Sequence, residues 1–374
     1  MPRRPIARGA AKSVNTEKDT MQTTHSLIIS DSRTMAAVDD QSIDLVVTSP
    51  PYPMIQMWDG LFSSLSPNVK IALDRGEGDA AFEAMHVELD KVWEELFRAL
   101  KPGCFACVNI GDATRTVRGE FRLYSNHSRI ITSFERLGFH CLPLILWRKQ
   151  TNAPNKFMGS GMLPSGAYVT LEHEYILVFR KGPKKEFKTP AQKAARMKSA
   201  YFWEERNRWF SDMWDFKGAS QTLDAAGLRT RSAAFPLELP YRLINMFSLY
   251  EETVLDPFMG SGATALAAMA GGRGSIGVEI DEAFSGIIAG QAAAFVPFAD
   301  TMRRSRMASH AAFVAARTEK KGPLRYKNSP HGFPVVTRQE TGMQVYTLKE
   351  IDASNPGAIL ASYDVAGRAP DCFL

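Results

Sequence analysis

The sequence predicts an α/β protein built on one doubly wound, mostly parallel sheet. Short β-branched, apolar segments alternate with segments of helical periodicity, and the alternation resumes after a basic segment at residues 181–230. Two of the apolar segments end in a rigid or glycine-rich loop, as the carboxyl ends of parallel strands do around a ligand. A single sheet with an insertion at its edge accounts for this pattern.

Length and composition agree with this class. A chain of 374 residues with 45% hydrophobic and 23% charged residues is typical of a large globular protein. It has no apolar run long enough to cross a bilayer and no signal-peptide core, so we expect a cytoplasmic protein without a membrane partner. Four cysteines, with one CxxC and no histidine pair nearby, predict neither a disulfide framework nor a metal site.

The first part of the chain carries the elements of one half-domain. A basic, disordered tail is expected at 1–22, followed by the half-domain at 23–180. Residues 54–80 lack periodicity and contain glycine, which predicts a mobile loop. The other predicted elements are strands at 43–48, 104–110, 142–147 and 175–179, and helices at 81–100 and 129–137, the last closed by Gly138.

A second half-domain is expected at 231–298. Residues 299–374 show no clear pattern and are predicted to be a C-terminal extension of unknown role. The predicted elements of the second half are helices at 237–249, 263–270 and 282–295, and strands at 253–255 and 275–280.

Positive charge is concentrated, although the formal net charge is only +5. Residues 180–208 hold ten Lys or Arg against three Glu, and residues 302–328 hold eight against one. The second cluster fits a solvated face as well as a nucleic-acid contact. In the first, aromatic residues are interleaved, which favours phosphate neutralisation and base stacking. We therefore interpret 181–230 as a target-recognition insertion. Candidates to contact guanine edges are Arg206, Arg208 and Arg229, together with Arg231 just after the insertion.

A glycine-rich loop lies between the strand at 253–255 and the helix at 263–270. Its glycines allow a sharp turn and close approach of the backbone to a ligand at a helix N-terminus. Glu279, at the end of the next strand, is placed to accept hydrogen bonds from two ribose hydroxyls. The loop is Asp256-Pro257-Phe258-Met259-Gly260-Ser261-Gly262.

Two ligand classes fit this loop. Gly260-x-Gly262-x-x-Ala265 also matches a nicotinamide-dinucleotide fingerprint. However, Asp256 and Phe258 occupy the turn that a pyrophosphate would approach. A carboxylate and an aromatic ring suit a phosphate-free cation such as S-adenosylmethionine. We favour the second ligand and keep a nicotinamide-dependent oxidoreductase as the alternative from another class.

The second loop is Ser49-Pro50-Pro51-Tyr52, directly after the strand at 43–48. Two consecutive prolines make it rigid, which aims the Ser49 hydroxyl and the Pro50 carbonyl at one point. Two acceptors at one point can take both hydrogens of an exocyclic amino group and turn its lone pair toward a methyl donor. Tyr52 is placed to stack on a base flipped out of the duplex. Methylation at carbon 5 of cytosine is disfavoured because the chain lacks a Pro-Cys loop.

With both loops placed, residues 25–295 resemble the beta-class amino-methyltransferases of bacterial restriction–modification systems. In that family a [Asn/Asp/Ser]-Pro-Pro-[Tyr/Phe/Trp] motif precedes Asp-Pro-Phe-x-Gly-Ser-Gly, with a target-recognition segment between them, and this order is found here. The resemblance implies the circularly permuted methyltransferase fold and S-adenosyl-L-methionine as donor. It also implies that Asp31 contacts the donor's adenine and that Phe235 lies near its methionine end. Glu174 lies in a segment similar to a family strand near the base pocket.

These observations predict a site-specific DNA methyltransferase that forms N4-methylcytosine, because Ser at the first motif position goes mainly with cytosine in this family. Methylation of adenine at N6 is the nearest alternative, and a DNA-binding protein with an inactive site is a third. The resemblance implies double-stranded DNA as partner, a possible cognate restriction endonuclease, and a monomer or homodimer.

Overall fold

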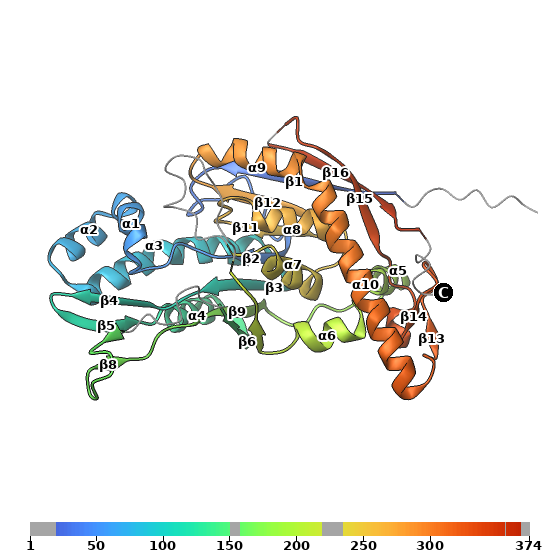
Figure 1. The fold of residues 1–374 in the computed structure, drawn as a ribbon. Helices are drawn as coiled ribbons and strands as arrows, with labels where there is room; N and C mark the ends of the chain where they lie inside the picture. Colours follow the sequence, from blue (N-terminus) through green and yellow to red (C-terminus); the bar gives the residue numbers. More distant parts are fainter. Residues whose placement is uncertain (1–19, 150–157, 219–234, 356, 368–374) are drawn as a thin grey trace, which may run out of the picture.

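The computed structural model describes residues 20–149, 158–218, 235–355 and 357–367 (Figure 1). Its strands are β1 (Thr20–Ile29), β2 (Ile43–Thr48), β3 (Leu100–Ile110), β4 (Ala113–Val117), β5 (Glu120–Tyr124), β6 (Phe139–Arg148), β7 (Met158–Gly159), β8 (Ala167–Tyr168), β9 (His173–Lys181), β10 (Met213–Asp215), β11 (Thr253–Asp256), β12 (Gly274–Glu279), β13 (Tyr326–Lys327), β14 (Pro334–Val335), β15 (Tyr346–Asp352) and β16 (Ile359–Val365). Its α-helices are α1 (Asp59–Leu65), α2 (Pro67–Asp74), α3 (Gly78–Ala99), α4 (Asn126–Leu137), α5 (Pro190–Lys198), α6 (Trp203–Trp209), α7 (Glu238–Phe247), α8 (Ala263–Gly271), α9 (Ala283–Ala293) and α10 (Val296–Lys321).

One mixed sheet of ten strands organises the molecule, in the order β10-β6-β9-β3-β2-β11-β12-β1-β16-β15. The five central strands, from β3 to β1, are parallel to one another. On one side β9 is antiparallel to both β3 and β6, and on the other β16 is antiparallel to β1. Strands β2 and β11 are neighbours although some two hundred residues separate them in the chain. Their carboxyl ends therefore meet at the same edge.

Helices cover both faces of this sheet, as the doubly wound class requires. Strand β2 is buried along its whole length, and its alternate residues belong to different cores. Val46 faces the cluster that contains α3 and α4, whereas Leu45 and Val47 face the cluster that contains α7 and α8. A nearly continuous apolar sequence, here interrupted by Asp44, is expected for a strand buried on both faces.

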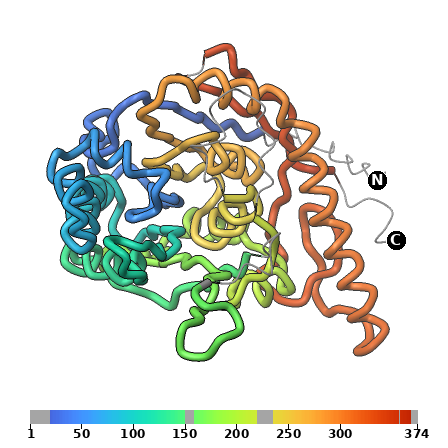
Figure 2. Tube along the Cα trace, turned by 60° about the vertical axis from the view of Figure 1, so that its left-hand side comes forward, coloured from blue at the N-terminus to red at the C-terminus, as the bar shows by residue number. Residues whose placement is uncertain are grey.

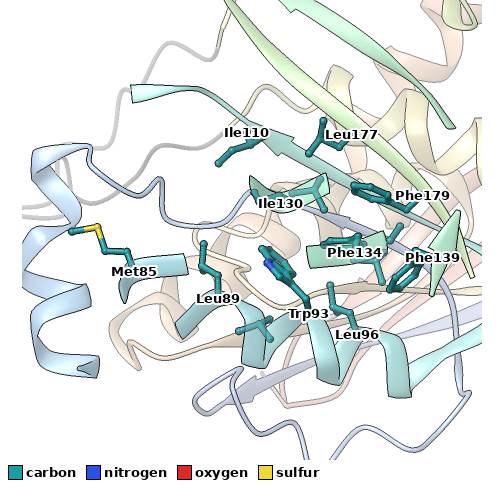
Figure 3. Close-up of a cluster of buried hydrophobic side chains, with 14 of the residues drawn as sticks. Met85, Leu89, Trp93, Leu96, Ile110, Ile130, Phe134, Phe139, Leu177 and Phe179 are labelled. Atoms are coloured by element: carbon teal, nitrogen blue, oxygen red, sulfur yellow. The ribbon is translucent and has the colours of Figure 1, made fainter. Parts of the chain in front are cut away.

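Helix α3 illustrates how periodicity produced a correct prediction. Met85, Leu89, Trp93 and Leu96 recur at the three- to four-residue spacing of one helical stripe and are buried. Figure 3 shows these side chains on the side of the helix that faces the aromatic rings from α4 and β9. The Phe134 and Phe179 rings in that group stack with centroids 4.1 Å apart.

The mobile loop predicted at 54–80 is wrong. These residues form a short 3₁₀ turn (Gln56–Trp58) and the helices α1 and α2. Phe62 and Val69 are buried against the core shared with α3, so tertiary packing stabilises helices that are each less than three turns long. Short helices of this kind leave a weak periodic signal.

The chain ends also differ from their predicted boundaries. Strand β1 begins at Thr20, so the last three residues of the expected tail at 1–22 lie in the sheet, while residues 1–19 lie outside the described part. The extension at 299–374 contributes β15 and β16 to the main sheet, and β16 pairs with β1 from Thr20 to His25. Figure 2 shows α10 and the C-terminal strands side by side along one flank. This segment is thus part of the fold rather than an appendage.

The 181–230 segment is only partly described, and three of its aromatic residues are buried, whereas Trp203 and Phe210 are exposed. Phe202, Trp209 and Trp214 are fully buried, and β10 adds an edge strand beside β6. They therefore pack in the core rather than serve as a surface for base stacking. Arg206 and Arg208 lie on α6, whereas Arg229 and Arg231 lie outside the described residues. A role of this segment in target recognition stays a prediction.

Within the described ranges, no single helix is long and apolar enough to cross a membrane. Helices α9 and α10, which are joined by a 57° bend, meet the length and composition criteria only when taken together.

Candidate active site

The two predicted loops emerge from neighbouring parallel strands. Val254 and Leu255 of β11 pair with Leu45 and Val46 of β2, so the Ser-Pro-Pro-Tyr loop and the glycine loop leave the sheet side by side. Pro51 and Phe258 line the same cavity, and the Tyr52 ring packs on the same core cluster as Phe258. The sheet topology therefore brings the two loops close together in space, although they lie far apart in the sequence.

Asp256 links the two loops through its buried carboxylate. One carboxylate oxygen accepts hydrogen bonds from Thr48 Oγ1 at 2.6 Å and from the Phe258 backbone N–H at 3.1 Å, and the other accepts one from Thr264 Oγ1 at 2.6 Å. Asp256 is not among the cavity-lining residues. It holds β2, the glycine loop and α8 together, whereas the sequence suggested that it faces a cationic ligand. Burial raises the pKa of Asp256 to about 6.

We expect Asp256→Asn to change how stability depends on pH. Because the folded-state pKa of Asp256 is raised from 3.8 to about 6, protonation favours the folded state. This stabilisation is complete below about pH 4 and is lost as the pH rises through the folded pKa. From pH 8 to pH 5 the wild type should gain about 1.4 kcal/mol in unfolding free energy relative to the variant, measured by urea denaturation. A pH-independent difference between the two proteins would contradict this account.

The matched control for that experiment is Asp74→Asn. Asp74 is an exposed carboxylate on α2 that forms a surface ion pair with Lys70. Surface pairs contribute little, so the control variant should follow the pH dependence of the wild type.

Glu279 is fixed at the end of β12 by three backbone donors. Its Oε2 accepts from Gly260 N at 2.8 Å, and its Oε1 accepts from Ile280 N and Asp281 N at 3.0 Å. Gly260, at a φ of 50°, adopts the left-handed backbone that favours glycine. A carboxylate held in this way keeps its orientation toward the cavity, where it also forms part of the wall.

The cavity has a volume of about 580 Å³ and a predominantly negative wall. Its charged lining consists of four carboxylates (Asp31, Glu88, Glu279 and Asp281) and one guanidinium (Arg33). Such a wall suits an organic cation and opposes a pyrophosphate, which carries negative charge. Most of the remaining wall is apolar or aromatic and is formed by Pro51, Met57, Trp58, Leu61, Phe62, Leu65, Leu89, Val92, Pro257, Phe258, Val278, Ile280 and Phe284.

Asp31 lies in this wall beside Arg33. The Arg33 guanidinium donates to Asp31 Oδ2 through Nε at 2.9 Å and through its terminal nitrogen at 2.7 Å. Partial burial raises the pKa of Asp31, but the hydrogen bonds and charge of Arg33 outweigh it and lower the pKa below its ordinary value. Asp31 is therefore an ionised acceptor at the cavity. Arg33 and Glu88 were not identified from the sequence, which shows no motif around them.

The other predicted residues of the donor side lie at different distances from the cavity. The Pro257 carbonyl accepts a hydrogen bond from Ser32 Oγ, which ties the glycine loop to the end of β1. Ser261 lies in the turn before α8, and Gly262, at a φ of 88°, precedes the first residue of that helix. Phe235 packs in the opposite core with Leu239 and does not line the cavity.

A polar cluster lies beyond Tyr52, next to the cavity. Tyr52 Oη donates to Glu174 Oε2 at 3.0 Å and lies 3.2 Å from Ser49 Oγ. Asn109 Nδ2 donates to Tyr52 Oη at 2.9 Å and to Glu174 Oε2 at 2.7 Å. Lys149 Nζ donates to Glu174 Oε1. These five residues, which we name the Ser49 cluster, come from the ends of β2, β3, β6 and β9.

Ser49 and Tyr52 of this cluster were predicted from the Ser-Pro-Pro-Tyr loop, and Glu174 and Lys149 lie in segments that resemble family elements on the base or DNA side. Asn109 was not predicted as a site residue. Asn109 and Lys149 lie at the carboxyl ends of β3 and β6. Both follow the rule that polar residues at the carboxyl ends of strands gather at one sheet edge. Trp147, near the end of β6, is not part of this cluster. It is 1% exposed and donates its indole N–H to the Phe216 carbonyl, so its role is packing. In the described part of the chain, no group of three or more His, Cys, Asp or Glu side chains is placed to hold a metal ion.

The fold and the paired loops define a nucleoside-binding α/β enzyme of the methyltransferase class. A model of the DNA methylase family, which comprises N6 and N4 methylases, matches residues 43–289, so the chain belongs to this family. This confirms the family inferred from the two motifs.

Similar proteins include two type II methyltransferases. M.MthZI of Methanothermobacter thermautotrophicus is 48% identical over 336 residues, which are 88% of this chain and 93% of that protein. M.MjaI of Methanocaldococcus jannaschii is 49% identical over 277 residues, 71% of this chain and 90% of that protein.

A solved structure confirms the predicted fold. The protein TTHA0409 of Thermus thermophilus, described as a DNA modification methylase and crystallised with S-adenosyl-L-methionine, superposes with a TM-score of 0.57 at 32% identity. The match covers 73% of this chain and 95% of TTHA0409. The doubly wound sheet with its permuted motif order is thus a methyltransferase fold.

Proposed function

We propose that this protein is a site-specific DNA methyltransferase that transfers a methyl group from S-adenosyl-L-methionine to N4 of a flipped cytosine. The observation that supports this most strongly is the arrangement of the two loops, in which Pro51 and Phe258 line one negatively charged cavity. Methyl transfer requires donor and acceptor to be held in line within a few ångströms, and neighbouring strand ends provide this proximity.

The donor side of the site follows from the cavity wall. Bound S-adenosyl-L-methionine supplies an activated methyl group on a positively charged sulfonium. Glu279, held by its three backbone donors, accepts hydrogen bonds from the ribose hydroxyls, and Asp31 contacts the adenine. Phe258 packs against the ligand, and Trp93 contacts the Phe258 ring in a T-shaped arrangement with the ring centroids 6.1 Å apart. The glycine-loop backbone at Pro257 and 260–262 encloses the ligand, and Asp256 positions that loop. Phe235 packs in the core on the opposite face of the sheet.

The acceptor side is the Ser-Pro-Pro-Tyr loop. Ser49 Oγ and the Pro50 carbonyl accept the two amino hydrogens of the base, which favours a pyramidal nitrogen with its lone pair directed at the methyl group. Pro51 keeps the loop rigid and forms the wall between base and donor. Tyr52 presents its ring to the face of the base. A base inside a duplex cannot reach this site, so the target must be flipped out.

Cytosine is the proposed target because Ser49 stands at the first position of the loop. An adenine amino group presents the same two hydrogens, so the proposal rests on the association of Ser with N4 methylation in the resembling family. The proposed partners are duplex DNA with a specific recognition site and a cognate restriction endonuclease, and the proposed state is a monomer or homodimer in the cytoplasm.

The test is modification-sensitive sequencing of DNA from a bacterial host that expresses the protein. We expect N4-methylcytosine at one defined sequence and none in a host that expresses Ser49→Ala. N6-methyladenine at a defined sequence would overturn the choice of base. No modification, from a protein that is folded and binds S-adenosylhomocysteine, would overturn the proposed activity itself.

A further inference from the structure

The Ser49 hydroxyl must be oriented as a hydrogen-bond acceptor, and its position alone does not ensure this. A hydroxyl is both a donor and an acceptor, and its hydrogen rotates to suit its neighbours. To accept a hydrogen from the target amino group, Ser49 must turn its own hydrogen away from the base. A nearby group that takes this hydrogen would fix the hydroxyl as an acceptor.

The Ser49 cluster supplies such a group through Tyr52. Ser49 Oγ and Tyr52 Oη are 3.2 Å apart, and Tyr52 Oη is 3.0 Å from Glu174 Oε2. The Asn109 amide is farther from Ser49 than from the phenol, at 3.5 Å against 2.9 Å. The phenol is therefore the better partner for the serine hydroxyl, and it connects Ser49 to the carboxylate.

The direction of these hydrogen bonds follows from the carboxylate of Glu174, at which they end. An ionised carboxylate only accepts hydrogen bonds, so Tyr52 donates its hydrogen to Glu174. The amide of Asn109 donates to both groups, which leaves the lone pairs of Tyr52 Oη for Asn109 and Ser49. The Ser49 hydrogen then points toward Tyr52, and a serine lone pair faces the base site.

Two features keep this direction from reversing. Lys149 Nζ donates to the second oxygen of Glu174 and lies 4.8 Å from the centre of the Trp147 ring, so both oxygens of Glu174 are engaged as acceptors. Burial, together with the negative charge of Glu174, raises the pKa of Tyr52 well above 10, so the phenol keeps the proton that it donates. The other polar atom of the Asn109 side chain, Oδ1, takes part in none of these hydrogen bonds: it is buried and has no partner among the described residues.

We propose that Glu174 is a positioning residue that orients the Ser49 hydroxyl, through Tyr52, as a hydrogen-bond acceptor for the target amino group. This inference rests on the proposed function of Ser49 and identifies the group that orients the Ser49 hydroxyl. Glu174 acts without touching the base.

Packing around the cluster is close, so a purely structural role for Glu174 must be distinguished. A Cβ atom at Gly111 would lie 3.0 Å from the Tyr52 ring and 3.3 Å from Glu174 Cγ. Only 12% of the Glu174 side chain is exposed. A structural defect would lower stability or weaken donor binding. Loss of the orientation of the Ser49 hydroxyl would lower kcat alone.

The test is a double-mutant cycle of Glu174→Gln and Tyr52→Phe. The amide cannot accept from both Tyr52 and Lys149, and phenylalanine keeps the ring but breaks the connection to Ser49. We expect each single variant to lose roughly 10- to 100-fold in kcat, with KM for DNA and affinity for S-adenosylhomocysteine within about threefold of wild type. The double variant should be about as slow as the slower single variant, because both changes interrupt one chain.

The matched control is Glu172→Gln. Glu172 lies two residues earlier, has 43% of its side chain exposed and pairs with Arg148 at the surface. It should retain wild-type kcat.

Each outcome decides between the inference and the proposed function beneath it. If the wild type methylates DNA but Glu174→Gln stays within threefold of its kcat, or if the losses in the double variant multiply, the inference is overturned and the proposed function stands. If Glu174→Gln does not fold, Tyr52→Phe alone decides, and an unchanged kcat in that variant would overturn the inference. If the wild type transfers no methyl group, the proposed function fails first.

Discussion

Ser49→Ala should lower kcat by roughly 100- to 1,000-fold while donor affinity stays unchanged. The Ser49 oxygen accepts one hydrogen of the target amine, and its removal leaves an uncompensated N–H in the transition state. Loss of one preorganised hydrogen-bonding group at a reacting centre typically costs this much. Since Ser49 does not line the donor cavity, binding of S-adenosylhomocysteine should not change. Single-turnover methyl transfer and calorimetric titration measure the two effects separately.

The control for this variant is Ser42→Ala. Ser42 immediately precedes β2, and its hydroxyl donates to the Asp39 carbonyl at 2.7 Å, far from the loop that follows the strand. It should be fully active. A Ser49→Ala protein that turns over within threefold of the wild type would show that the hydroxyl is not an acceptor for the amine.

Glu279→Ala should weaken binding of S-adenosylhomocysteine by at least about 100-fold. The substitution removes a carboxylate that accepts two hydrogen bonds from the ribose hydroxyls, each of which contributes on the order of 1.5–3 kcal/mol. It also leaves the backbone donors of Gly260, Ile280 and Asp281 without their shared acceptor, so the glycine loop loses its support. Isothermal titration calorimetry of the purified proteins measures the change.

Glu282→Ala is the matched control for donor binding. Glu282 is an exposed carboxylate three residues later and does not line the cavity. Its affinity should match that of the wild type, and NAD should bind none of the three proteins because the negative wall opposes a pyrophosphate. Tight binding of NAD to the wild type, or undiminished binding of S-adenosylhomocysteine to Glu279→Ala, would contradict the assignment of this cavity.

The central sheet was predictable because its strands are buried on both faces. Such strands are mostly apolar, as in the segment 43–48, where Asp44 and Thr48 are the two polar residues, and this segment was located to the residue. The helix α3 was predicted from its stripe of apolar residues for the same reason, namely that burial imposes a period on the sequence. Both elements lie where the core dictates the residue types.

The prediction failed where tertiary contacts, rather than local pattern, decide the structure. Helices α1 and α2 are short, and Phe62 is buried only because α3 lies beside it. Strand β16 buries Ile359, Ala361 and Tyr363 on one face, but the exposed Leu360 on the other face obscures the alternation of apolar and polar residues. Aromatic residues of 181–230 were interpreted as a stacking surface, although Trp209 and Trp214 are core residues.

The candidate site was predictable in its loops and not in its supports. Ser49 and Glu279 were predicted from motifs in which loop rigidity and strand ends explain where the side chains lie. Asn109 and Glu174 meet across the antiparallel pair of β3 and β9, a pairing of residues 65 positions apart that no local pattern reveals. Asp256 was predicted to face the ligand, whereas in the structure its carboxylate is bound by Thr48 and Thr264, which no local pattern identifies as its partners.

The most direct test of the central claim, that one crevice holds both the methyl donor and the target amine, is transfer of a labelled methyl group by the purified protein. Duplex DNA that carries the host-derived recognition site is incubated with S-adenosyl-L-methionine bearing a trideuterated methyl group, then digested to nucleosides for mass spectrometry. We predict N4-(trideuteromethyl)-2′-deoxycytidine as the labelled product. Label on carbon 5 of cytosine, or no labelled nucleoside from a protein that binds the donor, would contradict the account.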